Sequence, residues 1–143
     1  MRMAKINMTR VILGGVLAGL VVNIGEYFLN TSILGKLMEA SLQALNRPQV
    51  GNEGMAFYVV LGFAVGIFAI WVYAAIRPRF GAGTMTAICA GLMVWFLVSL
   101  YASAGLLPLH LFPRRLLLYG VIWTFFEFPL AVIAGAWIYK EDT

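Results

Sequence analysis

The sequence predicts an all-α integral membrane protein: four transmembrane helices in one bundle, with an amphipathic interfacial helix between spans one and two. Of its 143 residues, 62% are hydrophobic and only 11% are charged, whereas soluble domains are roughly 45–50% apolar and about 25% charged. The hydrophobic residues gather in four long runs, and a soluble fold could not hide that much apolar surface. Residues 1–143 are therefore predicted to form a single membrane domain.

Each apolar run is close to the ~20 residues that a helix needs to cross ~30 Å of hydrocarbon. Helix is expected throughout, because a segment in lipid must satisfy its backbone polar groups internally. Basic residues, prolines and glycines separate the last three runs. The predicted spans are Thr9–Asn30, Met55–Ile76, Thr84–Leu106 and Leu116–Tyr139.

The connection between the first two spans is the only long one. Its segment Ile33–Leu45 places apolar side chains at helical spacing, and the opposite face carries Lys36, Glu39 and Gln43. That pattern is typical of an amphipathic helix lying in a membrane interface, and Asn30–Ser32 could cap its start. We expect either a lid that plugs one end of the bundle, or a helix that docks a partner or gates a cargo.

Four spans place both chain ends on one side of the membrane. Basic residues are more numerous on that side, so the positive-inside rule predicts cytoplasmic termini in a cell (inner) membrane. The net charge of +4 is spread over helix ends rather than gathered in a long basic run, and it does not indicate nucleic-acid binding. The side with the chain ends carries Arg2, Lys5, Arg10, Arg77, Arg79 and Lys140, and the other side carries Lys36, Arg47, Arg114 and Arg115.

Two carboxylates lie inside the apolar spans, Glu26 in the first and Glu127 in the last. A charge near the bilayer centre costs at least ~2.5–3.5 kcal/mol, so such residues usually face a bundle interior and often carry function. Counting residues from Arg10 and from Arg115 places Glu26 near the outer interface and Glu127 close to mid-membrane, about 10 Å apart in depth. On this estimate they are two stations on one path rather than a pair that shares one proton.

Each glutamate has a structural and a functional interpretation. Glu26 lies at the level of the basic residues in the outer loops, so an ion pair would explain it. Glu127 has no basic residue at its level, and Pro129 nearby should kink the helix by removing a backbone N–H. Three roles compete for Glu127. It is a neutral acid hydrogen-bonded to Thr124 or to the backbone, or it handles a proton or cation, or it contacts a ligand or partner.

On a helical projection, small residues share a face with each glutamate. Such stripes are where membrane helices approach each other closely, and the second span adds a G-x-x-x-G pair. We therefore expect the helices to pack around an interior that holds both carboxylates. The predicted packing residues are Gly15, Gly19, Gly62, Gly66 and Gly120.

Two classes of function compete. In the first, the chain is a small carrier or channel, as a homo-oligomer, that moves a cation or small amphiphile. In the second, it is an accessory or scaffold subunit of a larger membrane complex, and the carboxylates are structural. The residues predicted to handle a proton, cation or ligand are Glu127, Glu26, Asn23, Thr124 and Tyr73.

An enzyme is not favoured, because the sequence has no Ser/His, Cys/His or metal-ligand cluster. His110 is the only histidine and a weak candidate for a metal ligand. Cys89 is the only cysteine, which excludes an intrachain disulfide. No cofactor is implied by these patterns.

Overall fold

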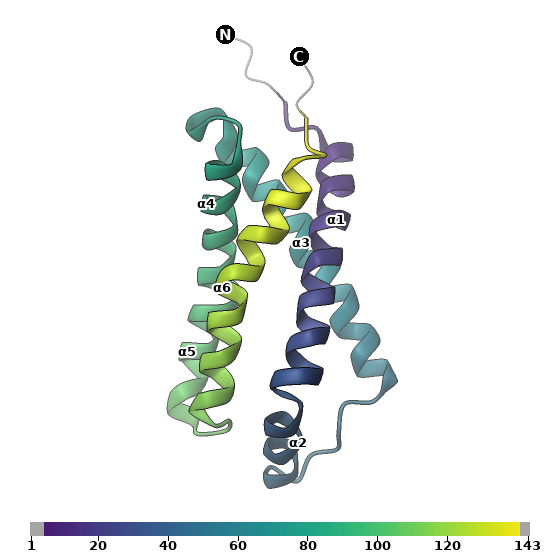
Figure 1. The fold of residues 1–143 in the computed structure, drawn as a ribbon, viewed down its shortest axis with the longest axis vertical. Helices are drawn as coiled ribbons and strands as arrows, with labels where there is room; N and C mark the ends of the chain where they lie inside the picture. Colours follow the sequence, from purple (N-terminus) through teal and green to yellow (C-terminus); the bar gives the residue numbers. More distant parts are fainter. Residues whose placement is uncertain (1–4, 141–143) are drawn as a thin grey trace.

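The computed structural model describes residues 5–140, and all regular secondary structure in that range is helical. Four helical stretches are long and apolar enough to cross a membrane, and they pack into one elongated bundle (Figure 1). The prediction of an all-α chain with four long apolar helices is therefore confirmed. The four stretches are Met8–Ile33, Asn52–Phe80, Thr84–Leu109 and Arg114–Ala136. Arg2, which entered the charge comparison, lies outside the described residues.

The first stretch is longer than predicted and leads almost directly into the amphipathic helix. It consists of α1 (Met8–Phe28) and the π-helical turn η1 (Leu29–Ile33), and α2 (Gly35–Ala44) follows. The predicted side-chain cap for α2 does not form. Instead, the Asn30 amide and the Thr31 hydroxyl donate to backbone carbonyls four residues earlier, which continues the helical path.

The helix α2 has the predicted amphipathic character. Lys36, Glu39 and Gln43 are exposed, whereas Leu34 and most of the apolar side are buried or half-buried. The helix ends before Asn46, whose left-handed φ of 52° breaks the helical path. It lies at the end of the bundle opposite to the start of α1 and the end of α6 (Figure 1).

The boundaries of the second span differ from the prediction. The helix α3 (Asn52–Phe80) passes the expected end at Ile76 and continues through Pro78. A proline in the last turn removes only one backbone hydrogen bond. The helix stops instead at Gly81, whose φ of 84° favours glycine.

The third and fourth spans form a close pair. The third changes its hydrogen-bond pattern along its length, through α4 (Thr84–Trp95), the π-helical η2 (Phe96–Tyr101), α5 (Ala102–Leu106) and the short η3 (Leu107–Leu109). The fourth is α6 (Arg114–Ala136), which ends before the predicted boundary at Tyr139.

The contiguous core fills the half of the bundle that holds the start of α1 and the end of α6. At the other end α3 crosses away behind α1 and α6 (Figure 1), and its Phe57 and Val60 are 62% and 65% exposed. Neither η2 nor α5 contributes a buried residue there. The bundle is thus tightly packed in one half and opened in the other. The core consists of Val11, Ala18, Val22, Ala69, Ile70, Tyr73, Ala74, Ala87, Ala90, Val94, Phe128, Ala131, Val132 and Tyr139.

Candidate functional site

Backbone contacts between glycines fix how α1 lies against its neighbours. A Cβ on Gly14 would meet the carbonyl of Gly135, so α1 and α6 touch there without an intervening side chain. On another face of α1, Gly66 of α3 lies against the backbone of Gly19. Small residues permit such close approach. α1 and α6 therefore meet backbone to backbone at this level.

Glu26 of α1 and Glu127 of α6 meet at the level where the contiguous core ends. Their carboxyl groups lie within hydrogen-bonding reach of each other. Two ionised carboxylates have no proton to donate and repel each other, so at least one of the two carries a proton when they are in contact. Gly25 makes room for the carboxyl group of Glu127, because a Cβ at that position would overlap with its Oε1.

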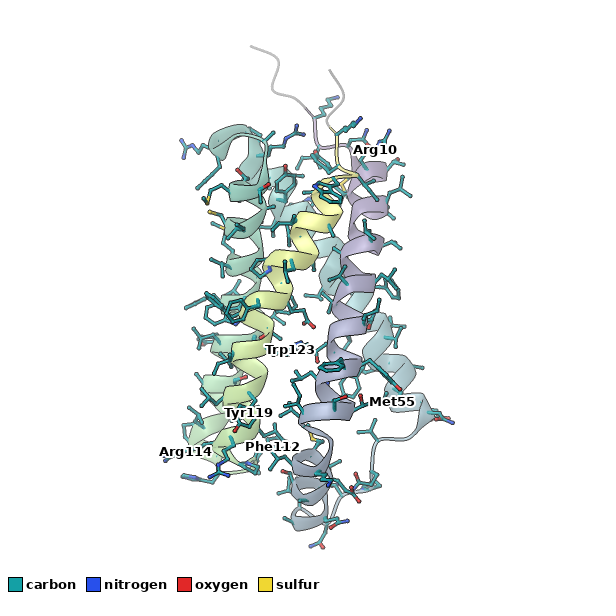
Figure 2. The ribbon with its side chains drawn as sticks, viewed as in Figure 1. Arg10, Met55, Phe112, Arg114, Tyr119 and Trp123 are labelled. Atoms are coloured by element: carbon teal, nitrogen blue, oxygen red, sulfur yellow. The ribbon has the colours of Figure 1, made fainter. Side chains whose placement is uncertain are left out.

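The carboxyl group of Glu127 is enclosed between two helices, and its residue is only 6% exposed. Its Oε1 accepts a hydrogen bond of 3.0 Å from the Trp123 indole N–H. Its Oε2 is fully buried and accepts no N–H or hydroxyl within the described structure. The Trp123 ring also stacks on Phe28, with 5.6 Å between ring centroids. Trp123 lies about midway along the bundle, between α6 and α1 (Figure 2).

The carboxyl group of Glu26 is held by the first residues of the π-helical turn. The Asn30 side-chain amide donates to Oε2 of Glu26 at 3.1 Å and to its backbone carbonyl at 2.8 Å. The partners of Glu26 in the described structure are therefore an amide and a second carboxyl group. The sequence suggested an ion pair between Glu26 and basic residues of the outer loops. In the structure Glu26 contacts Asn30 and Glu127 instead.

The prediction that a depth difference of about 10 Å keeps the two glutamate side chains apart is wrong. That estimate compared the heights of the Cα atoms alone. Side chains on a helix lean toward its N-terminus, and α1 and α6 run in opposite directions (Figure 1). Glu26 and Glu127 therefore lean toward each other along the bundle axis, and their side chains close the gap.

An apolar cavity of about 550 Å³ lies between α1 and α6 on the outer face of the bundle. Aliphatic and aromatic side chains line it, together with Glu127 and Trp123. Its rim is open to the surroundings, since Ile24 and Leu130 are 62% and 60% exposed. The volume falls within the roughly 300–1,000 Å³ that is usual for small-molecule sites.

A smaller cavity of about 230 Å³ lies on the other face of the same two helices, where η2 and α5 form its third side. The Ser99 and Thr124 hydroxyls are 2.6 Å apart within its lining. Because Thr124 donates to the Gly120 carbonyl at 2.8 Å, Ser99 is the donor in this pair. The carboxyl pair thus lies between an apolar cavity and a smaller one, which we call the polar cavity because polar side chains interrupt its largely apolar lining. The polar residues of the smaller cavity are Glu26, Asn30, Ser99, Ser103 and Thr124.

The structure brings only part of the predicted site together. Thr124 lies beside the glutamates, in the lining of the polar cavity. The Asn23 amide instead donates to the backbone carbonyl of Val59 at 3.1 Å, which ties α1 to α3. The Tyr73 hydroxyl accepts the Gly83 N–H at 3.3 Å within the packed half of the bundle, away from the carboxyl pair.

The predicted packing glycines are divided in the same way. All except Gly120 lie in the seam between α1 and α3. A Cβ on Gly120 would meet nothing within 4 Å, and this residue lines the polar cavity instead. The contact of Gly14 with Gly135 was not predicted, because an apolar helix rich in small residues offers several equivalent stripes.

Asn30, Ser99 and Ser103 were not predicted as site residues, and the contact of Trp123 with Glu127 was not predicted either. Spacing could have found two of them, because Trp123 precedes Glu127 by one turn and Asn30 follows Glu26 by one turn, and residues four apart meet on a helix surface. His110 is exposed at the end of η3, and the described residues contain no cluster of metal-ligating side chains. Comparisons with protein-family models, with curated proteins and with solved structures find no match for this chain.

Proposed function

We propose that this chain is an integral membrane carrier that exchanges a proton for a cation or small cationic amphiphile at the Glu26–Glu127 pair. The observation that carries the proposal is the contact between two acidic side chains inside a bundle of apolar helices, where an isolated charge would be costly. With one shared proton the pair bears a single negative charge. A cation that binds there adds positive charge and favours release of the proton, so the two compete for one site.

The apolar cavity supports a cargo with an apolar body. A single positive charge beside Glu127 would be neutralised by the carboxyl pair, and the face of Trp123 attracts cations. The remainder of such a molecule would lie against the aliphatic side chains of α1 and α6 that line the cavity. An anionic cargo would instead be repelled by the pair.

The surroundings of the site favour this proposal over the scaffold alternative. Under the scaffold alternative a partner helix would need a free stripe of small residues such as Gly62 and Gly66, but these two lie against Asn23 and Gly19 of α1. The excess of basic residues at the end where α1 begins supports cytoplasmic termini in an inner membrane. An assembly of several copies fits the exposed apolar faces of all four long helices.

The experiment uses purified protein in proteoliposomes, with decyltrimethylammonium as the cation and an enclosed pH dye as the proton reporter. The unaltered chain is expected to couple cation uptake to proton movement in the opposite direction. Glu127→Gln should abolish both fluxes, because the amide cannot take part in proton exchange. Glu39→Gln makes the same chemical change on the exposed face of α2 and should leave both fluxes intact. If Glu127→Gln transports as well as the unaltered chain, the proposed function is wrong.

A further inference from the structure

The carboxyl pair is sealed from one end of the bundle. The residues next to it on that side are fully packed: Val22, Val94, Phe128 and Val132 are all buried. Backbone contacts close the bundle on the same side, with Gly91 against Pro129 and, farther from the pair, Gly14 against Gly135. Nothing the size of a water molecule passes through such packing without movement of the helices.

Toward the opposite end the packing is different. There α3 crosses away from the other helices (Figure 1), and the polar cavity occupies the space between α1, η2, α5 and α6. Its apolar side chains are all buried except that of Val98, which is exposed: Leu29, Leu34, Val98, Leu116, Leu117 and Phe128. The rest of its lining leads from Glu26 past Asn30, which is exposed at this end of α1.

The chemistry of the lining suits water. Each buried water needs about two to four polar partners and about 30 Å³ of space in the liquid, so about 230 Å³ has room for several. The hydroxyl groups of Ser99 and Ser103 and the side chains of Asn30 and Glu26 supply partners of both kinds. Glu26 is the titratable residue of this lining, and it also touches Glu127 on the far side.

We propose that the polar cavity is a water-filled access path that connects the carboxyl pair to the α2 end of the bundle and to that end only. Protons reach Glu26 along its waters, with Asn30 holding the carboxyl group and Ser99 and Ser103 positioning the waters. The structure then corresponds to the state of the carrier that is open toward α2. This inference rests on the proposed exchange function. Its test measures the access of water to the cavity and not transport, so a dry cavity and an inactive carrier are distinguishable results.

The test is labelling of single cysteines by a membrane-impermeant cationic methanethiosulfonate, in reconstituted protein whose native cysteine is removed by Cys89→Ala. Ser103→Cys places a thiol in the cavity. Leu97→Cys is the matched control on the preceding π-helical turn, 59% exposed on the outer surface and outside both cavities. Lys36→Cys and Lys5→Cys, both at exposed residues, report on the two ends of the bundle.

We expect Ser103→Cys to be labelled from the side that labels Lys36→Cys, and Leu97→Cys to remain unlabelled. Adding Glu26→Gln should slow the reaction of Ser103→Cys with the cationic reagent, because the attracting charge is reduced. Failure to label Ser103→Cys would show a cavity filled by lipid or side chains and would overturn the inference, even if the flux experiment succeeds. Labelling from the side of Lys5→Cys, or from both sides, would equally overturn it.

Discussion

Gly66→Leu is expected to be the most destabilising single change in the bundle. A Cβ on Gly66 would overlap with the backbone nitrogen and Cα of Gly19, and backbone atoms cannot move aside as a flexible side chain does. Overpacking of a core usually costs about 1–3 kcal/mol, and we expect at least ~3 kcal/mol of lost stability because α1 and α3 must separate. Thermal or detergent-induced unfolding followed by circular dichroism measures the change.

Gly105→Leu is the matched control for that experiment. Gly105 also lies in a helix, in α5, but a Cβ there meets nothing within 4 Å. Exposed substitutions of this kind usually change stability by less than about 0.5 kcal/mol. Equal stability of the two variants would contradict the close seam between α1 and α3.

Gly25→Ala is expected to abolish exchange while leaving both glutamates in place. The added methyl group would occupy the position of Oε1 of Glu127, so Glu127 must turn away and lose its contact with Glu26. We expect a loss of coupled flux as complete as that of Glu127→Gln. The same proteoliposome assay measures it, and Gly105→Ala serves as the control for an added methyl group in a helix.

A second-site change makes this prediction sharper. Shortening the acid by Glu127→Asp in the Gly25→Ala background returns the space that the methyl group takes. The double variant is therefore expected to recover part of the flux that Gly25→Ala loses, a coupling that only residues in contact show. Full activity of Gly25→Ala alone would mean that the carboxyl contact does not matter for exchange.

The sequence was sufficient for the parts of the fold that depend on hydrophobicity alone. Four long apolar helices and the amphipathic α2 follow from composition and from periodicity, which are local properties. The ends of the helices depend on single residues in their context. Pro78 was expected to end the second span, but its place in the last turn is tolerated and the positive φ of Gly81 ends the helix instead.

The site could be predicted only in part, because it depends on how two helices face each other. Glu26 and Glu127 are visible as acids in apolar runs, but their contact follows from opposite helix directions and from the absence of a side chain at Gly25. Asn23 shares a stripe with Glu26, yet it bonds to α3. A projection onto one helix shows which residues share a face, not which neighbour that face meets.

The most direct test of the central claim is infrared spectroscopy of the protonated carboxyl groups at neutral pH, in the unaltered chain, in Glu26→Gln and in Glu127→Gln. If the two glutamates share one proton, the unaltered chain shows one protonated carboxyl band from the pair, and each of the two variants shifts or removes that same band. Two separate bands, each removed by one variant and unaffected by the other, would show that the carboxyl groups titrate independently and would contradict the shared-proton site.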